Sequence, residues 1–320
     1  MIIYMQAMVL DYTKKPSYDE IYLYCKNFTE KYNFIKCFDI GKTYLKRNIP
    51  ALAIGNLEKP TLFAGCFHSL EWLTTLLLIK FIEDVCLSYN NCVLNSQIFD
   101  NGINIKQILE KHGLIIVPLV NCDGIDLSCK NYTKEDIKQN FKKYSKTILK
   151  IMEKDNDALS KWQANIRGVD LNHNYNAGYD ILKIMEKEKG IIEPTYSLYG
   201  GKTFESEKET KAMIRLLKKF NFSKVFAFHS QGKEIYYSYG KHTPPQSKYI
   251  ADILGKMTGY TVCHPEGMAS HGGFKDYFIK HYHKPGFTFE IGEGKNPLPA
   301  EDLNEIYKDM KNAMAVALAL

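Results

Sequence analysis

Short apolar runs alternate along the chain with longer segments in which apolar residues recur every three or four positions. The short runs predict β-strands over residues 51–54, 61–65, 114–120, 224–228 and 286–291. The longer segments predict helices over residues 71–87, 134–154, 206–220 and 301–320. Strands that alternate with helices along most of a chain indicate an α/β fold, in which helices cover both faces of one sheet.

Ser206 and Glu209 match a capping box at the start of the third of these helices. The chain has no internal repeat and no long linker rich in Pro, Gly or Ser, so no internal division of the chain is expected. In open α/β sheets, ligands gather at the carboxyl ends of the strands. Polar residues that directly follow a strand are therefore the candidates for a site.

The composition fits a folded protein with a full core. Of the 320 residues, 45% are hydrophobic and 24% are charged, which excludes a disordered or low-complexity chain. The net charge of +6 is modest, and no Lys/Arg tract has the form of a nucleic-acid footprint. No nucleic-acid partner is expected, and the basic segment 134–154 is interpreted as a solvated helix face.

The sequence predicts a cytoplasmic protein. No apolar run approaches the roughly 18 residues of a membrane span, and the longest, residues 73–82, contains Lys80. The N-terminus lacks the basic region of a signal peptide. Eight cysteines without a C-x-x-C pair favour a reducing compartment. No membrane partner is expected, and the oligomeric state is left open.

Two predicted strands are each followed by a histidine. His68 comes directly after the strand 61–65 and its short extension, with Glu71 three residues later. His229 comes directly after the strand 224–228. A lone H-x-x-E or a lone histidine is weak evidence, since chance produces both. Together, two imidazoles and a carboxylate are the usual ligands of a catalytic zinc ion, with one position left for water.

Two further segments carry polar groups that suit this chemistry. Glu290 lies inside an apolar strand, where an acid is costly unless it has a partner or a task, such as taking a proton from water held by zinc. Asp170 could accept the free ring N–H of a ligand histidine. Asn172 and His173 could bind a substrate carboxylate.

Five motifs in a fixed order resemble those of the zinc carboxypeptidase family. They are H-x-x-E at residues 68–71, D-L-N-H-N at 170–174, S-E-x-E-T at 206–210, H-S at 229–230 and F-T-F-E at 287–290. The resemblance implies an N-terminal extension over residues 1–17 and a catalytic domain over residues 18–320. It also implies that this domain is a single α/β unit with a mixed, mostly eight-stranded sheet.

The same resemblance implies the roles of the site residues. His68, Glu71 and His229 would bind one zinc ion, and Glu290 would act as general base and acid. Asp170 would orient a ligand histidine, for which His68 is the best placed.

Residues 229–236 and 290–299 resemble the bacterial branch of the family that cuts γ-D-glutamyl–diamino acid bonds in peptidoglycan stem peptides. The expected function is therefore hydrolysis of the γ-D-glutamyl–diaminopimelate bond in a peptidoglycan-derived peptide. One alternative is a general zinc carboxypeptidase or an N-acyl amino acid deacylase on the same scaffold. A lesser alternative is a catalytically degenerate protein that binds muropeptides.

The chain departs from the family's pattern at the residues that bind a terminal carboxylate. His173 stands where the D-x-N-R-N motif has arginine, and a histidine lacks the fork and the permanent charge of a guanidinium. Gln163 follows Trp162 where the family has its oxyanion arginine, and Arg167 is a possible substitute. The family's mobile tyrosine corresponds to about Met268. These departures argue against ordinary C-terminal trimming.

Lys275 precedes Asp276 at a position that lines the family's specificity pocket beyond the scissile bond. A cation there would favour an acidic group on the leaving residue, and diaminopimelate carries two carboxylates. The alternative interpretation is an exposed lysine without a function.

Overall fold

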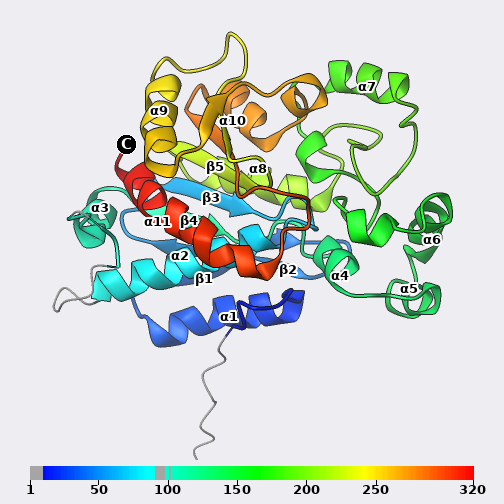
Figure 1. Ribbon diagram of the computed structural model, residues 1–320, viewed down its shortest axis with the longest axis horizontal. Helices are drawn as coiled ribbons and strands as arrows, with labels where there is room; N and C mark the ends of the chain where they lie inside the picture. Colours follow the sequence, from blue (N-terminus) through cyan, green and yellow to red (C-terminus); the bar gives the residue numbers. More distant parts are fainter. Residues whose placement is uncertain (1–9, 91–97, 101) are drawn as a thin grey trace, which may run out of the picture.

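The computed structural model describes residues 10–90, 98–100 and 102–320 as one mixed eight-stranded sheet with helices on both faces (Figure 1). The strands are β1 (Lys36–Lys42), β2 (Asn48–Ile54), β3 (Thr61–Gly65), β4 (Leu114–Val117), β5 (Lys224–His229), β6 (Glu234–Tyr236), β7 (Thr261–Cys263) and β8 (Gly286–Glu290). Their spatial order is β1-β2-β4-β3-β5-β8-β6-β7. The expected fold class is thereby confirmed.

The helices lie before, between and after these strands. They are α1 (Tyr18–Lys31), α2 (Leu73–Asn90), α3 (Ile105–Lys111), α4 (Gly124–Cys129), α5 (Lys134–Asn140), α6 (Ser145–Lys154), α7 (Tyr179–Glu188), α8 (Lys208–Lys219), α9 (Gln246–Thr258), α10 (Phe274–Tyr282) and α11 (Leu303–Ala319). In the described residues, every helix is too short or too polar to cross a membrane.

The centre of the sheet is parallel and buried. Strand β3 pairs in parallel with β4 on one side and β5 on the other, and β5 pairs in parallel with β8. Every residue of β3, β4 and β5 is buried, because helices cover both faces. This burial explains why these strands have nearly continuous apolar runs, which made them visible in the sequence.

The two edge strands, β1 and β7, and the neighbouring strand β6 were not predicted. Strand β1 is antiparallel to β2 and has no fully buried residue, while β6 and β7 each have three residues. Half-exposed or very short strands leave too few apolar positions for a pattern to register. The sheet therefore extends beyond the predicted strands on both sides.

The predicted helix over residues 134–154 is two helices. Phe141 leaves the helical conformation (φ −119°, ψ 31°), and α6 begins at Ser145. Phe141 and Tyr144 are buried in a small core that also contains Trp162. Apolar residues recur every three or four positions here because two short helices bury residues in the same core. This spacing suggested one continuous helix.

The predicted capping box at Ser206 is also wrong. Helix α8 starts after Glu207, whose backbone N–H donates to Asn174 Oδ1 (3.1 Å), and Ser206 Oγ donates to the Glu207 carboxylate (2.8 Å). Glu209 is fully buried, and its Oε1 has no hydrogen-bond partner. Burial, with the nearby charge of Asp123, raises the pKa of Glu209 to about 8.

The seven cysteines among the described residues are free thiols. The eighth, Cys92, lies outside the described residues.

The raised pKa of Glu209 predicts a pH-dependent stability. The folded chain holds this proton to about pH 8, whereas the unfolded chain releases it near 4.5, so the stabilisation is complete below pH 4.5 and is lost as the pH rises toward 8. Glu209→Gln removes this ionisation. Relative to wild type, the free energy of unfolding of the variant should rise on the order of 1 kcal/mol per pH unit across this window.

Urea unfolding at pH 5 and pH 8 measures the difference in the free energy of unfolding between Glu209→Gln and wild type at each pH. Glu153→Gln, at an exposed position on α6, is the matched control and should show no such difference. Equal pH profiles for wild type and Glu209→Gln would contradict the assignment.

Candidate metal centre and catalytic cavity

Three adjacent parallel strands end at the same edge of the sheet and bring the predicted site residues together (Figure 1). His68 follows β3 after a two-residue extension, His229 is the last residue of β5, and Glu290 is the last residue of β8. His229 and Glu290 are direct partners in the β5–β8 register. The position of this site was thus predictable from residues that follow apolar runs.

His68, Glu71 and His229 form a compact group whose possible ligand atoms all lie within 4.8 Å of one another. His68 Nδ1 is 2.8 Å from Glu71 Oε1, and His229 Nδ1 is 2.9 Å from Glu71 Oε2. The side chains of Glu71 and His229 are only 3% and 1% exposed. Both histidines therefore direct Nδ1 toward the same carboxylate.

The charges around this group favour a bound cation. Burial works against protonation of His68, but the charges of Glu71 and Asp170 outweigh it and raise its pKa well above the usual range. Burial likewise works against ionisation of Glu71, yet the two histidines lower its pKa. Two imidazoles and a carboxylate are the donor set of catalytic zinc sites, so these residues fit one zinc ion.

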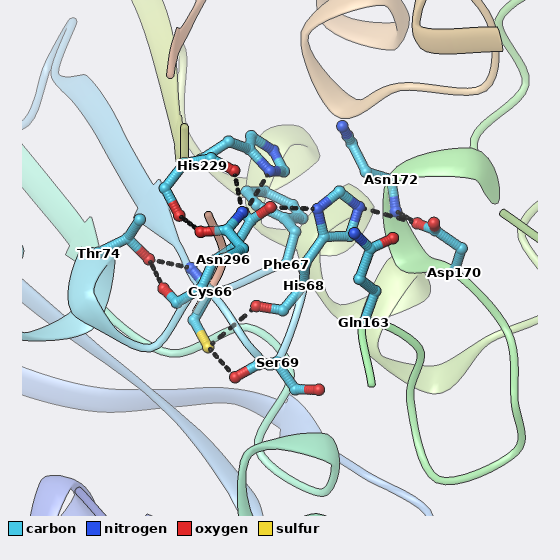
Figure 2. A network of polar contacts seen from close by, with 12 residues as sticks. Cys66, Phe67, His68, Ser69, Thr74, Gln163, Asp170, Asn172, His229 and Asn296 are labelled. Atoms are coloured by element: carbon cyan, nitrogen blue, oxygen red, sulfur yellow. Dashed lines mark hydrogen bonds and ion pairs between the residues drawn. The ribbon is translucent and has the colours of Figure 1, made fainter. Parts of the chain in front are cut away.

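Asp170 contacts His68 at Nε2, whereas Glu71 faces Nδ1. Figure 2 shows the contact between Asp170 and His68. Its Oδ1 lies 3.1 Å from His68 Nε2 and accepts the backbone N–H of Asn172 at 3.0 Å. Its Oδ2 accepts the backbone N–H of Leu198 at 3.0 Å. Since an ionised carboxylate only accepts, Asp170 fixes the proton on His68 Nε2. Nδ1, which faces Glu71, is then the nitrogen that would bind a metal in place of a proton.

Glu290 is the acid beside the metal group. Its pKa is raised well above the usual range, first by burial and then by the charge of Glu71, while His68 acts in the opposite direction. A cation between the ligands would lower this pKa again. The carboxyl group is thus placed where it can either accept or release a proton.

His68, Glu71, Asp170 and Glu290 line a cavity of about 220 Å³ at the carboxyl edge of the sheet. Sequence reasoning missed several residues of its wall, among them Leu198, Ser230, Tyr236, Ala269, Gly273, Asp276 and Thr288. Thr288 could have been found, because it lies two residues before Glu290 on the same strand and so on the same face. Leu198 and Ala269 come from segments that carry no pattern.

Gln163 and Asn172 line the cavity, and Figure 2 shows both beside His68. The Gln163 backbone is fixed, since its N–H donates to Tyr196 O (2.8 Å) and its carbonyl accepts from Ser69 N (3.1 Å). Asn172 Oδ1 accepts the backbone N–H of Phe274 (3.0 Å). The amide nitrogen of Asn172 is then the group left for a ligand.

His173 is buried, and both of its ring nitrogens face protein oxygens. Nδ1 lies 3.2 Å from Asp170 Oδ2, at ion-pair distance but without hydrogen-bond alignment, and Nε2 lies 3.3 Å from the carbonyl of Met268. To bind a substrate carboxylate, the ring would have to leave one of these oxygens. The Met268 side chain packs in a small core with Tyr179 and Leu182.

Arg167 does not replace the missing arginines. Its Nη1 donates to Tyr44 Oη (2.6 Å) and lies 3.4 Å from the buried carboxylate of Glu207, and it does not line the cavity. Lys275, by contrast, lines the cavity and is 3% exposed, so the interpretation as an exposed lysine is wrong. Its Nζ donates to Ser238 O (2.7 Å) and pairs with Asp276.

Residues 21–313 match the family described as zinc carboxypeptidase. The chain is 31% identical over 294 residues to γ-D-glutamyl-L-diamino acid endopeptidase 1 of Lysinibacillus sphaericus, an alignment that covers 92% of this chain and 69% of that protein. It is 31% identical over 284 residues to protein YqgT of Bacillus subtilis, with coverage of 88% and 71%.

The fold is similar to that of a solved structure. The crystal structure of thrombin-activatable fibrinolysis inhibitor superposes with a TM-score of 0.73 at 20% identity, covering 99% of this chain and 77% of that one. The sequence match over most of the chain carries the assignment, and the shared fold agrees with it. The protein is a zinc metallopeptidase of the zinc carboxypeptidase family.

Proposed function

We propose that this metallopeptidase hydrolyses the amide bond between γ-D-glutamate and diaminopimelate, or a similar diamino acid, in peptidoglycan stem peptides. The observation that carries the proposal is the group of zinc ligands beside Glu290, at a cavity whose wall contains Lys275 and, among the described residues, no arginine. The similarity to an endopeptidase named for γ-D-glutamyl-L-diamino acid bonds supports the choice of substrate.

His68, Glu71 and His229 would hold the zinc ion, and Asp170 would keep His68 in the correct tautomer. When bound, zinc supplies Lewis-acid activation of water and of the scissile carbonyl. The remaining steps are assigned to side chains of this chain.

Glu290 takes a proton from the attacking water as the water adds to the carbonyl carbon. The carboxyl group then passes this proton to the nitrogen of the leaving diamino acid, so that the C–N bond breaks and a free amine departs. Burial suits the acceptance and the later release of this proton, because it raises the pKa of Glu290 above the usual range. The charge of a bound metal ion would lower the same pKa.

Gln163 and Asn172 are assigned to binding. The Gln163 side chain would donate a hydrogen bond to the oxyanion that develops on the carbonyl oxygen. Asn172 Nδ2, and His173 if its ring turns, would bind a carboxylate of the substrate, and Lys275 would favour an acidic leaving residue. Among the described residues no guanidinium lines this cavity, so a carboxylate of the substrate would be bound here without an arginine fork.

The substrate would be a peptide released from peptidoglycan. The cytoplasmic location stays a prediction, because residues 1–9, on which the signal-peptide argument depends, lie outside the described residues.

Glu290→Gln tests the reaction and the base together. The zinc-loaded wild type should cleave L-Ala-γ-D-Glu-meso-diaminopimelate only at the γ-glutamyl bond, and the variant should be slower by about 100- to 10,000-fold, since it cannot move the proton. Mass spectrometry of the products gives both results. Glu293→Gln, an exposed neighbour, is the matched control.

Absence of cleavage by zinc-loaded wild type would overturn the proposed substrate. Turnover of a simple C-terminal dipeptide or an N-acyl amino acid instead would identify a general carboxypeptidase or a deacylase. Equal background rates for wild type and Glu290→Gln on every substrate would identify a binding protein.

Asp170→Asn should weaken zinc binding. The variant loses the charge that holds His68 Nε2, and loss of such a partner raises the metal dissociation constant by about 10- to 100-fold. Competition with a chromophoric chelator measures this constant directly. Asp180→Asn, on the exposed side of α7, should bind zinc as wild type does, and the same result for Asp170→Asn would contradict the role of Asp170.

A further inference from the structure

A second cavity lies beside the catalytic one and has a basic lining. It has a volume of about 430 Å³ and is formed by residues of the segments 238–242 and 264–271. Lys241, His242, His264 and His271 contribute to its wall, and none of the described residues that line it is a carboxylic acid. A wall of this composition suits an anion.

The two cavities share a boundary. Lys275 lines the catalytic cavity, and its Nζ donates to the carbonyl of Ser238, which lines the second cavity. Ala269 and Gly273 line the catalytic cavity, while His271, between them in sequence, lines the second. The two cavities therefore lie on either side of the Lys275–Ser238 contact.

The charge balance differs between the two sides of this boundary. The Lys275 ammonium forms an ion pair with the buried carboxylate of Asp276, so most of its charge is already neutralised. Lys241 has no ion pair with any of the described residues, and neither does His242. The positive charge that remains available to a ligand on this side is therefore in the second cavity.

The lining is held in place by hydrogen bonds. His264 Nδ1 lies 2.6 Å from Ser238 Oγ. Thr243 Oγ1 accepts from the N–H of Tyr239 (2.8 Å) and donates to the carbonyl of Gly240 (2.8 Å), which closes the turn that carries Lys241 and His242. The wall is thus formed without a ligand, which reduces the entropy lost on binding.

We propose that this second cavity binds a carboxylate on the leaving side of the scissile bond. The inference rests on the proposed function, because the leaving residue of that reaction carries carboxylates. The anion has two possible sources in a stem peptide. One is the distal carboxylate of the diamino acid side chain, and the other is the carboxylate of the residue that follows it.

Three peptides distinguish these sources. L-Ala-γ-D-Glu-L-Lys has neither group, L-Ala-γ-D-Glu-meso-diaminopimelate adds the distal carboxylate, and L-Ala-γ-D-Glu-L-Lys-D-Ala adds a following residue. Zinc-loaded wild type should cleave one of the last two with a kcat/KM about tenfold above that of the first, as one charged hydrogen bond provides. The preferred peptide identifies the source.

Lys241→Gln and His242→Gln should each reduce this preference at least about threefold, mainly through KM, because each removes one charged or polar contact with the carboxylate. The preference should also fall with added salt. Lys256→Gln, an exposed lysine on α9 outside the cavity, is the matched control. Calorimetric titration of each protein with free meso-diaminopimelate and with L-lysine gives a second readout that needs no turnover.

The outcomes separate the inference from the proposed function. Wild type could cleave the γ-glutamyl bond without preferring a peptide that carries the additional carboxylate, or the Lys241→Gln and His242→Gln variants could show the same preference as wild type. Either result would mean that the second cavity does not bind the carboxylate. If wild type cleaves none of the peptides, the proposed function fails. In that case the titrations alone test whether the second cavity binds a carboxylate. This binding is supported if diaminopimelate binds more tightly than lysine and if Lys241→Gln removes the difference, and it is refuted otherwise.

Discussion

The site depends on the parallel register of three strands at the centre of the sheet. Strands β3, β5 and β8 are hydrogen-bonded neighbours whose carboxyl ends meet at one edge, and the residues that follow or end them are His68, His229 and Glu290. A shift of one residue in this register would turn every side chain to the other face of the sheet. The burial of β3 and β5 on both faces prevents such a shift, so packing of the core fixes the geometry of the metal ligands.

Polar groups in this place are stable only as a set. Glu71, Asp170 and Glu290 bring three carboxyl groups into a buried region that contains three histidines, and the charges of these groups shift the pKa values of the three carboxyl groups. Removal of one member would leave a buried charge without its partner, which is costly. A dication at the centre is the component that balances this set.

Much of this arrangement could be predicted from the sequence. Buried central strands have continuous apolar runs, and the polar residues that end them stand out, so His68, His229 and Glu290 could be placed at one edge. The positions of Arg167 and Lys275 could not, because each depends on a partner distant in sequence. Tyr44 and Glu207 hold Arg167 away from the cavity, and Ser238 and Asp276 hold Lys275 at its wall. The break at Phe141 was hidden because two short helices share one apolar spacing.

The several contacts of the Asp170 carboxylate constrain how such an enzyme can acquire a new substrate specificity. One carboxylate holds the metal ligand His68 and the backbone of Asn172 and Leu198, and it also faces His173. The segment from Asp170 to Asn174 therefore cannot be displaced without disturbing the metal centre. Evolution of substrate preference here must proceed by exchange of side chains on a fixed backbone, and position 173, whose side chain lines the cavity, is a place for such an exchange.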